Sequence, residues 1–147
     1  MMIRERPAVL WALLVTLGQL SARALIGGAA LLLAPSGRLG GLSPVPLVGT
    51  VLADFFVPGL VLFVVFGLGS AVTSYGLYAR RGWGWLAGVA IAGGLLLWIL
   101  VEGVVGFHRP TGYLNLATAG AVFLLAVHPS VRSGYHEPRT PGSSCAV

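Results

Sequence analysis

Residues 93–107 read GGLLLWILVEGVVGF, an almost wholly apolar run that carries a single carboxylate, Glu102. Such a run is typical of a helix that crosses the hydrocarbon core of a bilayer, which takes roughly 20 apolar residues. An ionised acid inside that core is costly unless another group compensates it. The stretch therefore predicts a transmembrane helix and raises the question of what stabilises Glu102.

The composition extends this prediction to most of the chain. Of 147 residues, 56% are hydrophobic and 9% are charged, and the mean hydropathy is +0.91, whereas soluble domains carry about 25% charged residues. A soluble fold of this size leaves too much of its surface in water to hide so much apolar area. The net charge of +5 is spread over scattered arginines without a basic stripe, which argues against nucleic acid as a partner. We expect the lipid bilayer to be the solvent.

Four apolar segments predict an all-α, polytopic membrane four-helix bundle over residues 1–131. Their expected ranges are 7–34, 55–78, 84–107 and 112–131, the last interrupted near its end by His128 and Pro129. The first segment contains an A-x-A sequence at 22–24, but its apolar run continues far beyond a signal-peptide core, which favours a retained anchor helix. The long Gly- and Pro-rich outer loop between helices one and two is expected to fold back over the bundle, with a short helix near 46–53. Residues 132–147 are predicted to form a disordered cytoplasmic tail.

Arginines flank the predicted helices unequally, and this asymmetry predicts the orientation. One side carries Arg4, Arg6, Arg80, Arg81, Arg132 and Arg139, and the other carries Arg38 and Arg109. Cytoplasmic loops are enriched in basic residues. The pattern therefore predicts a multi-pass protein of a bacterial plasma membrane with both termini in the cytoplasm.

Arg23 and Glu102 are the only ionisable side chains well inside the predicted spans. Each charge costs about 2.5–3.5 kcal/mol at a helix centre on insertion scales, so pairing them is the economical arrangement. Gln19 shares a helix face with Arg23, and Trp98 lies one turn before Glu102. We predict a buried polar lock made by Arg23, Gln19 and Glu102.

Several alternatives remain open at the outer side of the predicted bundle. Arg109 lies on nearly the same helix face as Glu102 and is a rival partner for it, and His108 is a weaker one. Asp54 precedes the second helix and is predicted to be its N-cap, accepting from free backbone N–H groups. Together with Glu102, these residues would line a polar outer mouth.

The sequence predicts neither a metal site nor a cofactor. Cys145 is the only cysteine, which excludes an internal disulfide and a thiolate metal cluster. The three histidines are expected on different sides of the membrane. Nucleotide-binding, zinc-protease and hydrolase motifs are absent from the sequence.

Three stretches carry a resemblance to a family. They read DFFVPGLVLFVVFGLG at 54–69, YGLYARRGWGW at 75–85 and LLLWILVEGVVGF at 95–107. This arrangement resembles a group of small, uncharacterised bacterial four-helix integral membrane proteins, and in overall plan it is more distantly similar to DoxX-type proteins. The resemblance covers about half of the chain and implies the fold without supplying a mechanism. Members with Gln in place of Glu102 weaken the case for obligatory proton transfer there.

Three classes of function follow. The first is a non-catalytic membrane subunit or scaffold that contacts a second copy or another membrane protein through small-residue helix faces. The second is a small proton- or cation-coupled transporter that uses Glu102 in an outward-facing cavity. The third, a membrane enzyme with an outer-face site, ranks last because the candidate groups fit no catalytic arrangement.

Overall fold

The fold consists of helices in which each long helix packs against the next one in the sequence. The computed structural model describes residues 8–41, 54–105 and 110–136, and those residues contain helices and turns but no strand. The elements in chain order are α1 (Ala8–Leu33), the 3₁₀ turn η1 (Arg38–Gly40), α2 (Phe56–Val61), the π-helical segment η3 (Leu62–Leu68), α3 (Gly69–Tyr78), α4 (Gly82–Val105), α5 (Pro110–Val127) and α6 (Pro129–His136). The second span is continuous and consists of α2, η3 and α3. The short helix expected near 46–53 lies outside the described residues.

Three helices are long and apolar enough to cross a membrane. They are Ala8–Leu33, Phe56–Tyr78 and Gly82–Val104, and a shorter apolar helix covers Gly112–Val127. Their ends agree within three residues with three of the predicted segments. Large apolar side chains remain exposed on these helices, such as Val15 at 68% and Val104 at 89%. This outward apolar surface is what a lipid solvent accommodates.

The predicted fourth helix is divided by a break at His128. The structure ends α5 at Val127 and begins α6 at Pro129, so the expected single helix 112–131 is wrong in its last turn. Proline lacks a backbone N–H and disfavours a helical residue before it, but it fits the first turn of a new helix. His128 caps α6, because the N–H groups of Val131 and Arg132 donate to its carbonyl oxygen at 2.9 and 3.1 Å. The first residues of the predicted tail are therefore helical.

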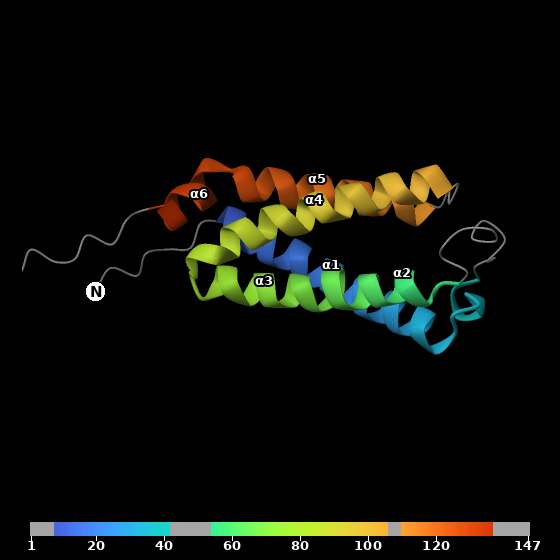
Figure 1. Cartoon of the computed structure of the whole chain (residues 1–147). Coiled ribbons are helices and arrows are strands. Elements are labelled where there is room, and N and C mark those ends of the chain that lie inside the picture. Colours follow the sequence, from blue (N-terminus) through green and yellow to red (C-terminus); the bar gives the residue numbers. More distant parts are fainter. Residues whose placement is uncertain (1–7, 42–53, 106–109, 137–147) are drawn as a thin grey trace, which may run out of the picture.

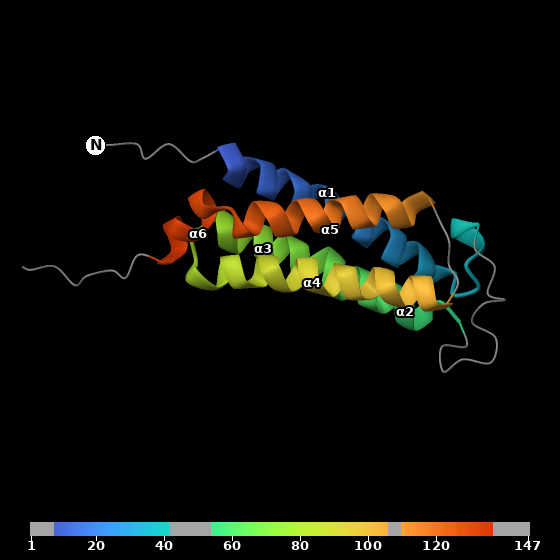
Figure 2. The same cartoon turned by 90° about the horizontal axis from the view of Figure 1, so that it is seen from above.

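The three candidate spans and the shorter helix α5 form a ring in chain order. α1 packs against α2, η3 and α3 on one side and against α5 on the other, while α4 packs against α3 and α5. Figure 1 shows α4, α5 and α6 in one layer and α1, α2 and α3 in the other, and Figure 2 shows α1 crossing the bundle obliquely. The buried core between the layers is built chiefly from Leu13, Leu17, Phe66, Leu77, Leu95 and Val122.

Glycines bring α1 very close to the second span. A Cβ added to Gly28 would lie 2.7 Å from the Phe63 backbone nitrogen, and one added to Gly59 would lie 2.7 Å from the Leu31 Cβ. Both distances are shorter than any van der Waals contact, so only glycine fits at these two positions. The contact involves η3, where the backbone departs from regular α-helix.

The turn between α3 and α4 contains a residue with left-handed backbone. Arg80 has φ 52°, and the N–H of Arg81 donates to the Gly76 carbonyl oxygen at 2.8 Å, which closes the end of α3. The left-handed position at the end of a helix is usually occupied by glycine, because a residue with a Cβ is strained in that conformation.

We therefore expect Arg80→Gly to raise the stability of the folded protein by about 1 kcal/mol. Thermal unfolding in detergent measures the change, and Arg81→Gly is the matched control because it removes an arginine from the same turn. An equal or larger gain from Arg81→Gly would contradict the assignment of strain to Arg80.

Candidate functional site

Arg23 lies inside the bundle, and its partner is an amide on another helix. Its Nη2 donates to the side-chain oxygen of Asn115, so the contact joins α1 to α5. The other terminal nitrogen, Nη1, is buried without a hydrogen-bond partner. Asn115 can accept from a guanidinium without adding a second charge. Arg23 is thus compensated by a hydrogen bond to a neutral side chain and not by the predicted pair with Glu102.

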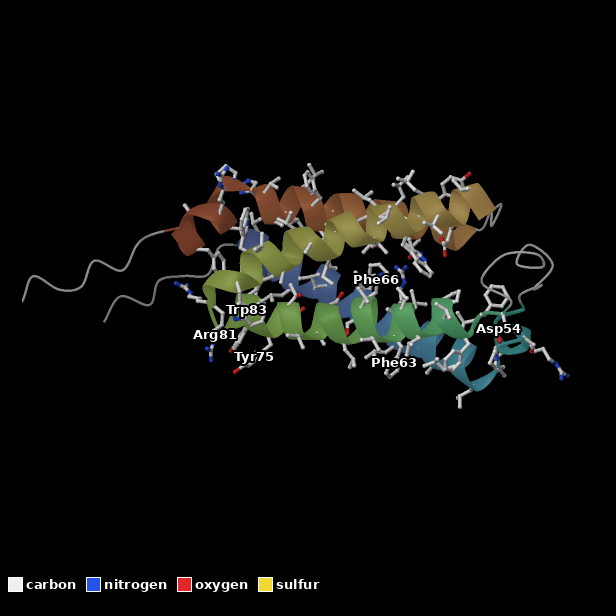
Figure 3. All side chains as sticks on the ribbon, in the orientation of Figure 1. Asp54, Phe63, Phe66, Tyr75, Arg81 and Trp83 are labelled. Carbon is white, nitrogen blue, oxygen red and sulfur yellow. The ribbon has the colours of Figure 1, made fainter. Side chains whose placement is uncertain are left out.

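Glu102 is half-buried on α4 and takes a hydrogen bond from its own helix. The indole Nε1 of Trp98 donates to Glu102 Oε1 at 2.9 Å, one turn away. The Trp98 ring meets Phe66 of η3 edge to face, with ring centroids 6.1 Å apart. Phe66 points between the two layers, whereas Phe63 points away from α4 (Figure 3). Trp98 therefore connects the carboxylate of Glu102 to the apolar core.

These contacts place side chains from four helical segments at about one level of the bundle. The Ser21 hydroxyl of α1 donates to the Gly67 carbonyl oxygen of η3 at 2.8 Å, close to Arg23 on one helix and to Phe66 on the other. We call this level the mid-bundle layer, and its members are Arg23, Phe66, Trp98 and Asn115. Glu102 lies one turn farther along α4.

The remaining predicted site residues are not part of the mid-bundle layer. Gln19 is exposed on α1, so its expected place in a buried lock is wrong. Asp54 is exposed just before the second span, and its Oδ1 accepts from the Phe56 N–H at 3.0 Å. The N-cap of α2 is Phe55, so Asp54 lies one residue before the predicted capping position. Figure 3 shows Asp54 at the opposite end of the bundle from Arg81.

His108 and Arg109 lie outside the described residues, so Arg109 as a partner for Glu102 stays a prediction.

The reasoning from sequence missed Asn115. It is the only asparagine of the chain and lies within an otherwise apolar helix. An amide in such a helix indicates a polar partner nearby, and that signal would have paired it with Arg23.

Other polar groups also join helices to one another. The indole Nε1 of Trp85 on α4 donates to the Ala126 carbonyl oxygen of α5 at 2.8 Å, and the Tyr135 hydroxyl on α6 donates to the Leu77 carbonyl oxygen of α3 at 2.7 Å. Among residues 8–41, 54–105 and 110–136, no three His, Cys, Asp or Glu side chains are grouped so that they could hold a metal ion. Four of the described polar contacts, made by Ser21, Arg23, Trp85 and Tyr135, join one helix to another.

Comparisons with known proteins add no family to this picture. No family model matches the chain, and neither a curated protein nor a solved structure matches it. The resemblance to small four-helix membrane proteins therefore stays a prediction.

Proposed function

We propose that this protein is an integral membrane protein that acts as a non-catalytic subunit or scaffold. In this proposal it lies in a bacterial plasma membrane with both termini in the cytoplasm, and its spans are held in fixed register by interior hydrogen bonds. The observation that carries the proposal is the Arg23–Asn115 contact, which uses an intramembrane charge to join α1 to α5.

The other interior contacts support the same reading. Ser21 joins α1 to η3, Trp85 joins α4 to α5, and Tyr135 joins α6 to α3. A polar side chain that donates to a group on a neighbouring span contributes to the order and register of the helices. A subunit or scaffold requires such a rigid frame and outward faces for its partners, and needs no reactive group.

A small proton- or cation-coupled transporter is the second candidate. It is favoured by one observation, the half-buried carboxylate of Glu102 positioned by Trp98 within an apolar helix. Acids in such places often mark proton or ion routes. The two candidates differ in whether Glu102 must move charge.

A flux measurement separates them. The purified protein is reconstituted into liposomes that contain a pH-sensitive dye, and a potential or a sodium gradient is imposed. We expect the same proton flux from wild type, Glu102→Gln and protein-free liposomes. A flux that wild type supports and Glu102→Gln abolishes would overturn the proposal and favour the transporter, provided that both proteins melt at similar temperatures. Leu97→Gln, on an exposed position of the same helix, is the control for adding an amide to α4.

A further inference from the structure

An amide faces outward from the middle of the first span. Gln19 is exposed and lies within about 2 Å of the midpoint of α1 along the helix axis. Val15 and Ile26 lie on the same outward side, exposed at 68% and 73%. In the part of the chain that the structure describes, the side chain of Gln19 has no hydrogen-bond partner. Thr16 and Arg23 lie at the edge of this face, and both of their side chains have partners within the chain.

Hydrocarbon is a poor environment for that amide. An unpaired amide in an apolar medium loses its hydrogen bonds to water at a cost of about 2–7 kcal/mol. Thr16, one turn earlier on α1, avoids this cost because its hydroxyl donates to the Ala12 carbonyl oxygen at 2.8 Å. Gln19 has no such contact with any other residue of the ranges 8–41, 54–105 and 110–136. Its position therefore calls for a polar group from another membrane-embedded helix.

The backbone beside Gln19 is open to close approach. A Cβ added to Gly18 would meet nothing within 4 Å, and Ala22, one turn later, is also exposed. Small residues one turn apart let two membrane helices approach until side-chain amides can hydrogen-bond across the contact. Gly18 and Ala22 lie on the same side of Gln19 around the helix, about 100° and 60° from it, and the amide lies between them in height.

We infer that a second copy of this chain docks on this face, with the two Gln19 amides hydrogen-bonded to each other. Two copies inserted in the same orientation are related by a two-fold axis along the membrane normal, so each residue near the axis meets its own counterpart at the same depth. A residue there must complement itself, and a primary amide does so because it both donates and accepts. The inference rests on the proposed function, since it names the partner that a non-catalytic subunit binds.

Cysteine cross-linking tests the dimer in the bilayer. With Cys145→Ser as background, a single cysteine is placed at Val15 or Ala22 on the α1 face, or at Leu97 on the exposed side of α4, and reconstituted membranes are treated with a lipid-soluble oxidant. We expect a species of twice the 15.2 kDa chain mass from Val15→Cys and Ala22→Cys and none from Leu97→Cys. Absence of that species from both α1 variants overturns the inference, as does equal cross-linking of Leu97→Cys.

Two further variants test the named contact. Gln19→Leu should weaken the dimer by about threefold to thirtyfold, the effect of losing an interhelical hydrogen bond in a membrane. Gly18→Leu should abolish the dimer by blocking close approach. Gly93→Leu is its matched control, because Gly93 is also an exposed helical glycine with nothing within 4 Å of an added Cβ. Dimerisation unaffected by Gln19→Leu and Gly18→Leu overturns the inference.

The outcomes also separate this inference from the proposed function. If the protein is monomeric and shows no Glu102-dependent flux, the dimer is overturned and the non-catalytic assignment stands. If a Glu102-dependent flux is observed, the assignment as a non-catalytic subunit is overturned, whether the protein is a monomer or a dimer. In cells, the same cysteine variants cross-linked only to a different membrane protein would identify another occupant of the face and overturn the second copy.

Discussion

Gly28→Ala is expected to destabilise the folded protein by about 3 kcal/mol. The added Cβ would lie 2.7 Å from the Phe63 nitrogen and 2.8 Å from its Cα. These are backbone atoms, so the clash cannot be relieved by rotating a side chain, and α1 must move away from the second span. Overpacking of a well-filled interior typically costs about 1–3 kcal/mol, and a backbone contact belongs at the upper end. Thermal unfolding in detergent, or titration with a denaturing detergent, measures the loss.

Two neighbouring substitutions make the result specific to close packing. Gly27→Ala adds the same methyl one residue away, where the nearest atom is the flexible Leu62 Cδ2 at 3.3 Å. Gly93→Ala adds it where nothing lies within 4 Å, and it should be neutral or stabilising by up to about 1 kcal/mol through helix propensity. If Gly28→Ala unfolded at the same temperature as these two controls, the result would contradict the close contact between α1 and η3.

Asn115→Leu is expected to destabilise the protein by about 2–3 kcal/mol. Arg23 would keep its part-buried charge and lose its hydrogen bond to Asn115, the one side-chain partner it has among the described residues. Hydrogen bonds to charged groups contribute about 1.5–3 kcal/mol, and removal of one partner leaves the other desolvated and unpaired. The same unfolding measurement detects the loss.

A double-mutant cycle turns this prediction into a test of the contact itself. Arg23→Met removes the charge and keeps much of the side-chain volume, so the Arg23→Met/Asn115→Leu protein should be more stable than Asn115→Leu alone. Thr118→Val is the control on α5, because the Thr118 hydroxyl is bonded within its own helix to the Leu114 carbonyl oxygen. A coupling energy near zero between Arg23 and Asn115 would show that the contact does not hold α1 to α5.

The extent of the helices could be predicted from sequence because it depends on local properties. The apolar run that begins near Pro7 has enough length and hydropathy to form one helix, and α1 covers Ala8–Leu33. The hydrogen bond of Asp54 is local in the same way, since its carboxylate accepts from the N–H of Phe56, two residues along the chain, although the N-cap of α2 is Phe55, one residue later than predicted. The end of the last apolar helix was the exception. The sequence predicted one helix interrupted near its end, whereas the structure has two helices, because α5 ends before Pro129 and α6 begins at it.

The partner of Arg23 could not be predicted from sequence because it depends on which helices are neighbours. The predicted depths of Arg23 and Glu102 in the membrane favoured Glu102 as the partner. In the ring, however, α5 lies beside α1, while α4 packs mainly against α3 and α5. Arg23 therefore meets Asn115. The outward position of Gln19 is another consequence of packing, because the rotation of α1 is set by where Gly28 and Ser21 contact the second span.

The sequence by itself determined that this chain is helical and that its helices are apolar enough for a membrane, because hydropathy and helix length are summed over neighbouring residues. Only the tertiary structure decided which charges are compensated, which glycines permit close contact and which amide remains on the outside. Those properties depend on the order and rotation of helices around the ring, and they arise from contacts between residues far apart in the chain.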